Sequence, residues 1–373
     1  ELADGAEPTH LSVVDAPAGI LDPDVWSGEA FDGVVTNPPY VGTRQMDRAL
    51  VARLTELDGG TVSDLAVMVQ RRAWDLVAEG GRCGTITPAG WLNDHAAAPL
   101  RRRMLAEGGP RVVAPLGQRV FDQAPLVFCA LTVLERSGPS GSWQLLRPAD
   151  ADEEGLIAAA GTASVVDGGP LRRLAVPPFA PQVPVRLLTA TRPTVSDFFT
   201  TFDGAWTGSH RRDVRAWWEL PDDTGWVRVS GGQGREGWAA GTAFRMRAEH
   251  VGDQPDRTGL VEYPRVAGGW LCARAAEDGT AARAGVVTFR PRSDEAHART
   301  AELLAVFNTR IGTAWLRTLT SGLNFNPGYA GRIPLGSEPP GDDLRAAVGE
   351  AVALRRELIR RDPTSDEFEG IPW

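Results

Sequence analysis

The chain has 373 residues, of which 42% are hydrophobic and 23% are charged, so it is long enough to bury one large core or two ordinary ones. Its formal net charge of -9 argues against nonspecific polyanion binding over the whole surface, although a local basic groove is compatible with it. All 39 basic residues are arginines, so any phosphate contact must come from arginine or from backbone amides.

Cysteine and hydropathy patterns indicate the compartment. The three cysteines, Cys83, Cys129 and Cys272, show no CxxC spacing and are odd in number, which favours a reducing cytoplasm. No apolar run approaches the roughly 18 residues of a membrane span, and no signal peptide opens the chain. The five histidines have no metal-ligand spacing. We therefore expect a cytoplasmic protein with no metal site and no membrane partner.

The first stretch alternates strand-like and helix-like patterns. Residues 10–15, HLSVVD, predict a short strand that ends in the acid Asp15, and residues 31–36, FDGVVT, predict a second strand. Residues 63–81 carry apolar side chains at helical spacing, with Ser63 placed to cap the helix and glycines placed to end it. We therefore expect a helix over 63–81.

Further strands and a helix follow. Residues 82–92 predict a strand and a turn, and residues 98–109 predict a helix whose arginine run from Arg101 would form a solvated face. Residues 111–117 and 126–135 predict two strands with no helix between them, the second apolar enough to be central. Alternating strands and helices indicate an α/β sheet, and the last two strands indicate an antiparallel hairpin at its end.

The composition changes near residue 138, where Gly, Ala, Pro and Asp become frequent. The second half is rich in tryptophan and turns, and helices are expected over 295–319 and 342–361. We accordingly expect a sheet domain, a connection, an α+β domain, and a C-terminal helix with a linker, over residues 1–137, 138–182, 183–340 and 341–373.

The stretch Asn37-Pro38-Pro39-Tyr40 must end the strand at 31–36, because proline cannot donate to a sheet ladder. Ligands bind open α/β sheets at the carboxyl ends of the strands. There the Asn37 side-chain carbonyl and the Pro38 backbone carbonyl would present two acceptors, which suit a planar amine such as N6 of adenine. Accepting both hydrogens draws the lone pair out of ring conjugation and makes the nitrogen nucleophilic. Tyr40 can stack on the base once the base leaves the duplex.

NPPY after an apolar strand resembles motif IV of the N6-adenine DNA methyltransferases that use S-adenosylmethionine, although related NPP tetrapeptides serve glutamine and other amide nitrogens. HLSVVD resembles the strand whose terminal acid contacts the cofactor adenine, which implies that Asp15 binds the cofactor. AVMVQRRAWDLVAEGGRCGTITPAGWL resembles the family's next helix–GG–strand–P-x-x-W-L block. PLGQRVFDQAPLVFCALTVLE is similar to the hairpin whose phenylalanine packs on the flipped adenine, which implies Phe121, with Phe128 nearby in sequence.

The second half is similar to the target-recognition half of large single-chain methyltransferases of phage-defence (BREX-type) systems and of related restriction–methylation fusions. The matching stretches lie at 202–220, 229–238, 303–312 and 323–335. The resemblance covers nearly the whole chain. It implies a partial Rossmann-like methyltransferase sheet ending in an antiparallel hairpin, then an α+β target-recognition domain, with double-stranded DNA as partner. Within the stretch at 202–220, Arg211 and Arg212 lie in a Gly-flanked loop and are the candidates for phosphate contact.

One departure from the family concerns the cofactor. The family's glycine-containing loop after its first strand, and the acid that ends its second strand, would lie upstream of residue 10 and are absent. We therefore expect a fragment whose S-adenosylmethionine site is incomplete, which is inactive alone, and which needs the missing N-terminal part of the same protein or a partner chain. The alternatives are a non-catalytic DNA-binding or specificity module, and catalysis on RNA or a protein amide, which the long second half disfavours.

Overall fold

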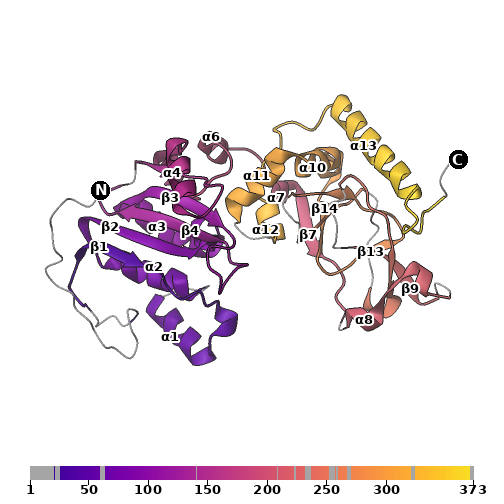
Figure 1. Cartoon of the computed structure of the whole chain (residues 1–373). Helices are drawn as coiled ribbons and strands as arrows, with labels where there is room; N and C mark the ends of the chain where they lie inside the picture. Colours follow the sequence, from indigo (N-terminus) through magenta and orange to yellow (C-terminus); the bar gives the residue numbers. More distant parts are fainter. Residues whose placement is uncertain are drawn as a thin grey trace. The chain divides into compact units, whose positions relative to one another are not determined.

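The structure is a computed structural model, and it falls into two compact units, Glu1–Ala180 and Pro181–Trp373 (Figure 1). The residues that it describes are 21, 26–58, 64–139, 141–207, 209–221, 224–231, 237–251, 257, 259–266, 270–320 and 324–369. The predicted strand at 10–15 and the predicted cap Ser63 lie outside these residues.

The first unit is built on a sheet in the order β1-β2-β4-β3-β5-β6. The strands in chain order are β1 (Phe31–Thr36), β2 (Val77–Pro88), β3 (Gly109–Gly117), β4 (Cys129–Glu135), β5 (Ser142–Leu145) and β6 (Ser164–Asp167). β1 and β2 are parallel, whereas β4 runs antiparallel to both β2 and β3. The α/β fold is therefore confirmed, and β3 and β4 form the expected hairpin with the apolar β4 inside the sheet.

Helices cover this sheet and join its strands. They are α1 (Arg48–Asp58), α2 (Leu65–Asp75), α3 (Ala98–Glu107), α4 (Glu153–Gly161) and the short α5 (Gly168–Leu171), with 3-10 turns η2 (Thr43–Gln45), η3 (Ala89–Leu92) and η4 (His95–Ala97). Trp74 of α2 is fully buried, and its indole Nε1 donates to Glu107 Oε2 of α3 at 2.9 Å. An ion pair between Arg103 of α3 and Asp75 of α2, at 2.6 Å, gives the two helices a second polar contact.

The helix predicted over 63–81 is shorter than expected. Asp64 begins it, since its Oδ1 accepts from the Ala66 N–H at 2.8 Å, and the helix ends at Asp75. Val77 already pairs with Phe31 of β1, so the apolar residues that seemed to continue the helix belong to a buried strand. Sheet pairing therefore overrides the helical spacing in the last third of the predicted segment.

The solvated arginine face predicted on the helix at 98–109 is wrong for Arg101. This side chain is fully buried in α3. Its guanidinium donates to the carbonyls of Trp91, Asn93 and Pro177, at 3.2 Å for Asn93 and 2.5 Å for Pro177. A buried guanidinium satisfied by carbonyls is a structural clamp, and here it joins η3 to the segment at Pro177, which lies 76 residues after Arg101.

The segment 138–182, expected as a connection, is largely structured. It contains β5, α4, β6 and α5, and β5 pairs in parallel with β3. The sheet therefore continues for two strands beyond the hairpin. Trp143 of β5 is buried and donates from Nε1 to the Phe179 carbonyl at 3.0 Å, so the end of the segment also packs on the first unit.

The second unit contains two sheets of four strands among its described residues, ordered β13-β9-β10-β8 and β12-β11-β14-β7. The strands are β7 (Phe199–Asp203), β8 (Val214–Ala216), β9 (Trp226–Ser230), β10 (Phe244–Arg247), β11 (Val261–Pro264), β12 (Arg274–Ala275), β13 (Thr280–Ala282) and β14 (Val286–Pro291). The rings of Tyr263 and Phe289 stack at 5.8 Å, and Phe307 packs edge-on against both. These short strands therefore enclose an aromatic core.

Helices of the second unit are mostly short. They are α6 (Val185–Leu188), α7 (Val195–Phe198), α8 (His210–Asp213), α9 (Asp294–Ala298), α10 (Thr300–Phe307), α11 (Arg310–Leu319), α12 (Pro327–Ala330) and α13 (Asp342–Arg360), with 3-10 turns η5 (Trp217–Glu219) and η6 (Ala248–His250). The helix expected over 342–361 is confirmed as α13. No helix among the described residues is long and apolar enough to cross a membrane.

The single helix expected over 295–319 is divided into α9, α10 and α11. Asn308 separates the last two, and its Nδ2 donates to the carbonyls of Ala273 at 2.7 Å and Leu304 at 2.9 Å. Thr309 then caps α11, because its Oγ1 accepts from the Gly312 N–H at 3.1 Å. Polar side chains that bond the backbone locally compete with helix continuation, which explains the break.

A buried ion cluster joins the two sheets of the second unit. Glu262 of β11 accepts from Arg274 Nε at 2.7 Å and from Arg257, and all three side chains are 2% exposed. Ser230, on β9 of the other sheet, donates from Oγ to Glu262 Oε2 at 3.0 Å. The two flanking arginines hold the pKa of Glu262 below its ordinary value against the effect of burial.

Candidate active site

The Asn37-Pro38-Pro39-Tyr40 stretch begins directly after β1, at the edge where β1 and its parallel neighbour β2 both end. Pro38 is buried, whereas Asn37 is exposed. The following residues are tied to the start of α2, since the Leu65 N–H donates to the Val41 carbonyl at 2.9 Å. The motif therefore stands at a fixed place on the sheet edge while its amide side chain faces solvent.

The Tyr40 side chain is anchored at both ends. Its hydroxyl donates to the Ile86 carbonyl of β2 at 3.2 Å, and its ring meets the Phe121 ring with centroids 6.1 Å apart and planes at 64°. Burial, with the neighbouring Cys129 thiol, raises the pKa of Tyr40 well above its ordinary value. Tyr40 therefore stays a neutral phenol, suited to stacking and hydrogen bonding rather than to proton abstraction.

Phe121 lies in the loop that joins β3 to β4. The backbone bonds that shape this loop include those from the Ala124 N–H to the Phe121 carbonyl and from the Arg119 N–H to the Pro125 carbonyl, both at 3.1 Å. Arg119 has a φ of 64°, which lies in the left-handed region. Of the two phenylalanines considered from the sequence, the structure brings Phe121 into ring contact with Tyr40. Its role toward a substrate stays a prediction.

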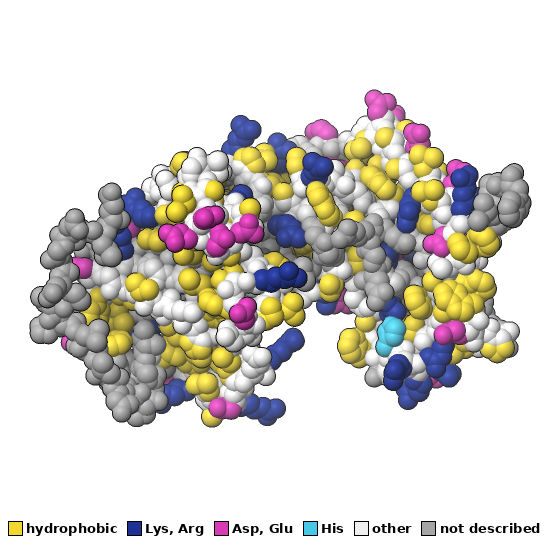
Figure 2. All heavy atoms as spheres, in the orientation of Figure 1, with side chains coloured by type: hydrophobic (Ala, Val, Ile, Leu, Met, Phe, Trp, Pro, Cys, Tyr) yellow, Lys and Arg dark blue, Asp and Glu magenta, His cyan; other side chains and the backbone are white. Residues whose placement is uncertain are grey.

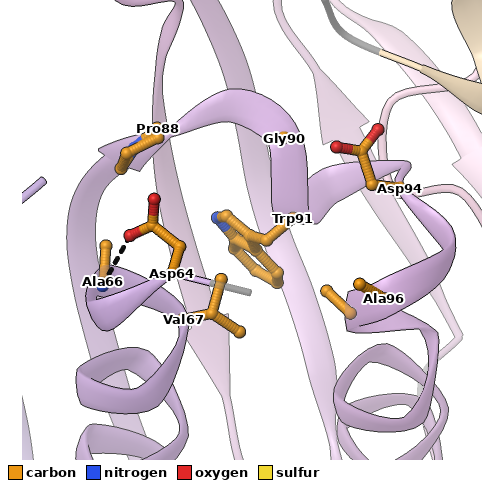
Figure 3. A pocket seen from close by; sticks show the side chains of 9 residues that line it. Asp64, Ala66, Val67, Pro88, Gly90, Trp91, Asp94 and Ala96 are labelled. Carbon is orange, nitrogen blue, oxygen red and sulfur yellow. Dashed lines mark hydrogen bonds between the residues drawn. The ribbon is translucent and has the colours of Figure 1, made fainter. Parts of the chain in front are cut away.

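A cavity of about 190 Å³ opens at the carboxyl end of β2 (Figure 3). Asp64, Trp91 and Asp94 supply its polar and aromatic lining. The Trp91 indole donates from Nε1 to Thr87 Oγ1 at 2.7 Å, and burial raises the pKa of Asp64 despite the bond from the Ala66 N–H. The sequence pointed to this place only through its P-x-x-W-L block, and the carboxylates of Asp64 and Asp94 were missed.

The remaining predicted site residues lie elsewhere. Asp15 lies outside the described residues. Arg211 and Arg212 belong to the second unit, on α8, where both are exposed. Arg212 Nε is 2.8 Å from Oδ1 of the buried Asp213, and its second nitrogen lies 3.2 Å from Oδ2. Arg212 thus already has an anionic partner, whereas Arg211 makes no side-chain bond within the described part of the chain.

Comparison with known proteins agrees with this geometry. Residues 21–121 match the family model described as Eco57I restriction-modification methylase. The chain is 32% identical over 115 residues to "Type II methyltransferase M.XhoI" of Xanthomonas vasicola. That match covers 29% of this chain and 20% of the relative, so the chain spans only about a fifth of that protein's length. The matched family region includes β1, NPPY, the Trp91 cavity and Phe121.

Two solved structures share the fold over most of the chain. The Type IIL restriction-modification enzyme MmeI, solved with DNA, matches with a TM-score of 0.58 and 10% identity, covering 91% of this chain and 52% of that one. A nuclease-deletion mutant of the Type ISP enzyme LlaGI, solved with a DNA substrate mimic, matches with a TM-score of 0.53 and 10% identity, covering 89% and 42%. These two structures show the fold of the chain, and the family match marks residues 21–121 of the first unit as similar to a restriction–modification methylase.

Proposed function

We propose that the chain is the amine-activating and DNA-reading part of an enzyme that methylates adenine N6 in DNA, within a restriction or phage-defence system. The observation that carries this proposal is the position of Asn37-Pro38-Pro39-Tyr40 at the carboxyl edge of β1, with the Tyr40 ring beside Phe121. This edge offers amide and carbonyl acceptors next to two aromatic rings. Those groups match a flipped, amine-bearing base in both hydrogen bonding and stacking.

The described residues at this edge fit the acceptor amine rather than the cofactor. Asn37 and the Pro38 carbonyl are hydrogen-bond acceptors, and Tyr40 is a neutral ring held by Ile86 and Phe121. The residue proposed to bind the cofactor adenine, Asp15, lies outside the described residues. S-adenosylmethionine, when bound, would supply the electrophilic methyl group.

The chain's own contribution is to polarise the amine. In the proposed complex the Asn37 side-chain oxygen and the Pro38 carbonyl each accept one N6 hydrogen. The nitrogen lone pair then leaves ring conjugation and points out of the base plane, so that the nitrogen can act as a nucleophile without prior deprotonation. Tyr40 would stack on the base, and Phe121 would limit its position from the neighbouring loop.

The second unit is proposed to read the DNA sequence. The fold likeness to MmeI and LlaGI extends over 91% and 89% of this chain, so it includes this unit, and both of those proteins were solved with DNA or a DNA mimic. The unit presents short strands and loops rather than one large sheet. Figure 2 shows arginine side chains, in dark blue, gathered at the lower right over α8. Such a surface can contact phosphates and enter a groove.

Replacement of Asn37 tests the proposal. In the complete enzyme, we expect Asn37→Ala to lower the rate of methyl transfer by about 10² to 10³, the usual effect of removing one preorganised polar contact to a transition state. DNA affinity should be unchanged, because Asn37 is exposed and acts on the flipped amine. The rate is measured by transfer of a tritiated methyl group from S-adenosylmethionine to duplex DNA, and the affinity by fluorescence anisotropy.

Asp32→Ala is the matched control, since Asp32 is exposed on the same strand but lies outside the motif. It should change neither quantity. Parent-like methyl transfer by Asn37→Ala would contradict the catalytic assignment. No transfer by the complete parent enzyme, under conditions in which both DNA and the cofactor are bound, would instead favour a non-catalytic DNA-binding module.

A further inference from the structure

A second cavity, of about 140 Å³, lies within the second unit. The chain from β9, β10, β12 and the end of α13 forms its wall. Its polar lining consists of the arginines Arg274 and Arg283 and of the residues Asp362, Thr364 and Ser365 that follow α13. Neither the amine-activating site nor the predicted arginine pair on α8 includes any of these residues.

Arg283 is the unusual member of this lining. It is only 8% exposed, so its cation is removed from water, yet it forms no ion pair with any carboxylate in the described parts of the chain. Its contacts are the Phe244 ring, 5.6 Å from the guanidinium carbon, and the His210 ring nitrogen at 2.7 Å. Burial and the charge of Arg274 lower the pKa of Arg283 from its ordinary value. A buried cation without a counter-charge is costly, and natural proteins rarely keep one without a use.

The neighbouring ions do not remove this imbalance. Arg257 and Arg274 share the one carboxylate of Glu262, so two cations face one anion before Arg283 is considered. Asp362 lines the cavity, but its Oδ1 accepts from the Thr364 N–H at 2.9 Å and from Thr364 Oγ1 at 2.7 Å. The wall itself carries the guanidinium groups of Arg274 and Arg283 and the carboxylate of Asp362. Since Glu262 is shared by Arg274 and Arg257, these five described groups together keep one excess positive charge.

His210 extends the site toward the α8 surface. Its Nε2 lies 2.7 Å from the Arg283 guanidinium, and the ring is exposed at the start of α8. Partial burial and the Arg283 charge lower the pKa of His210, so the ring is neutral near pH 7 and accepts a hydrogen bond from the arginine. Protonation would turn His210 into a second donor toward an anion shared with Arg283.

We propose that the cavity lined by Arg283, with His210 at its edge, binds a tetrahedral phosphate anion, either a DNA backbone phosphate or free inorganic phosphate. The planar guanidinium can present two N–H groups to phosphate oxygens, a geometry that lysine cannot supply. Assignment to DNA rests on the proposed function, whereas the anion site itself does not.

The first experiment uses inorganic phosphate and the whole chain. Thermal unfolding is followed by tryptophan fluorescence as phosphate replaces chloride at constant ionic strength. We expect phosphate to raise the Tm of the parent chain. Arg283→Met should weaken the apparent phosphate affinity by about 10- to 100-fold, as expected for loss of a charge-assisted pair of hydrogen bonds. Arg283→Lys should fall between the two, because it keeps the charge but not the planar pair of donors.

Arg290→Met is the matched control. Arg290 also stacks on a phenylalanine, Phe202, at 5.2 Å, but it is exposed and does not line the cavity. It should retain the phosphate response. Without phosphate, Arg283→Met should unfold at the parent temperature or higher, since it removes a buried charge that lacks a counter-ion. The proposal is overturned if phosphate does not stabilise the parent, or if it stabilises Arg283→Met equally.

The second experiment distinguishes the source of the phosphate. Duplex binding is titrated at several salt concentrations with cognate and scrambled DNA. If the anion is a backbone phosphate, Arg283→Met reduces the slope of log affinity against log salt by about 0.9 for both duplexes. An unchanged slope, together with a lost response to inorganic phosphate, assigns the site to free phosphate. Methyl transfer enters neither measurement, so failure of the proposed function would leave this test intact.

Discussion

Glu135 shows how a single side chain can be held by two strands at once. Its carboxylate accepts from Arg82 Nε of β2 at 3.0 Å and from Arg111 of β3. The hydrogen bond from Arg111 lowers the pKa of Glu135 most, and the hydrogen bond from Arg82 lowers it further. Burial acts in the opposite direction, and the pKa falls from 4.5 to about 2. The ion group therefore contributes stability only while Glu135 is ionised in the folded protein.

This pKa shift predicts a pH-dependent stability. Because the folded pKa lies below the unfolded one, the contribution is present in full above about pH 4.5 and is lost as the pH falls toward 2. Both arginines are largely exposed, so solvent screening limits the effect, and Glu135→Gln should cost about 1 kcal/mol at pH 7. Urea unfolding measured from pH 7 to pH 2 should show the parent and the variant converging.

Glu79→Gln is the control, since Glu79 is an exposed residue of β2 that forms no ion pair within the described structure. It should follow the parent at every pH. A difference between parent and Glu135→Gln that is the same at pH 2 as at pH 7 would show that Glu135 acts through its shape rather than its charge.

Two helical glycines differ in how the stability of the chain should respond to replacement by alanine. Gly312 stands in the first turn of α11, and a Cβ there would lie 2.1 Å from the Val306 carbonyl oxygen at the end of α10. Gly349 stands in the interior of α13, where a Cβ would meet nothing within 4 Å. Because the atom that a Cβ at Gly312 would meet belongs to the backbone, rotation of a side chain cannot relieve the clash.

We therefore expect Gly349→Ala to stabilise the chain by about 0.5–1 kcal/mol, because alanine loses less backbone entropy in a helix. Gly312→Ala should reverse that sign and destabilise by roughly 1–3 kcal/mol, the usual range for overpacking. Equilibrium unfolding of the two variants in urea gives both values. If Gly312→Ala were as stabilising as Gly349→Ala, the tight junction between α10 and α11 would be incorrect.

Some helices and strands could be predicted from the sequence more accurately than others. The strands β1, β2, β3 and β4, and the end of β1 before Asn37, were predicted correctly because the local apolar pattern and the final environment agree there. The helix over 63–81 was drawn too long, since Leu76 and Val77 fit helical spacing but are buried in or beside β2. Periodicity alone cannot separate these outcomes where a helix leads directly into a buried strand.

Tertiary contacts account for the other differences. Arg101 looked solvated because charged residues are seldom fully buried, and its carbonyl partners include Pro177, 76 residues distant in the chain. The break at Asn308 depends on the Ala273 carbonyl, 35 residues away. The contact of Tyr40 with Phe121 likewise depends on the fold of the β3–β4 loop. Each of these contacts joins residues that are distant in the sequence, so local sequence patterns could not predict it.

Across the whole molecule, a net charge of -9 makes the proposed DNA binding depend on a few local cations. Arg211 is exposed and makes no side-chain bond within the described structure, whereas Arg212 shields the buried Asp213. Arg211→Gln is therefore the cleaner substitution. If Arg211 meets a phosphate, affinity should fall equally for cognate and scrambled duplexes, and the salt slope should decrease by about 0.9.

Arg53→Gln, which removes the same charge from exposed α1 in the first unit, controls for net charge. It should leave the slope unchanged. If Arg211 instead reads guanine, its loss should cost about 1–3 kcal/mol on cognate DNA only. Unaltered binding to both duplexes would place α8 away from the DNA and remove the assignment of Arg211 and Arg212 to the contact surface.

The buried Glu262 cluster couples the unfolding of the two sheets in the second unit. Ser230 comes from one sheet, and Glu262 and Arg274 come from the other, so neither sheet can detach without leaving buried charges with fewer partners. Partial opening of this unit should therefore be rare, and the two sheets should behave as one cooperative element. Native-state hydrogen exchange should give the amides of β9 and β11 the same free energy of opening, and Glu262→Gln should lower both values together.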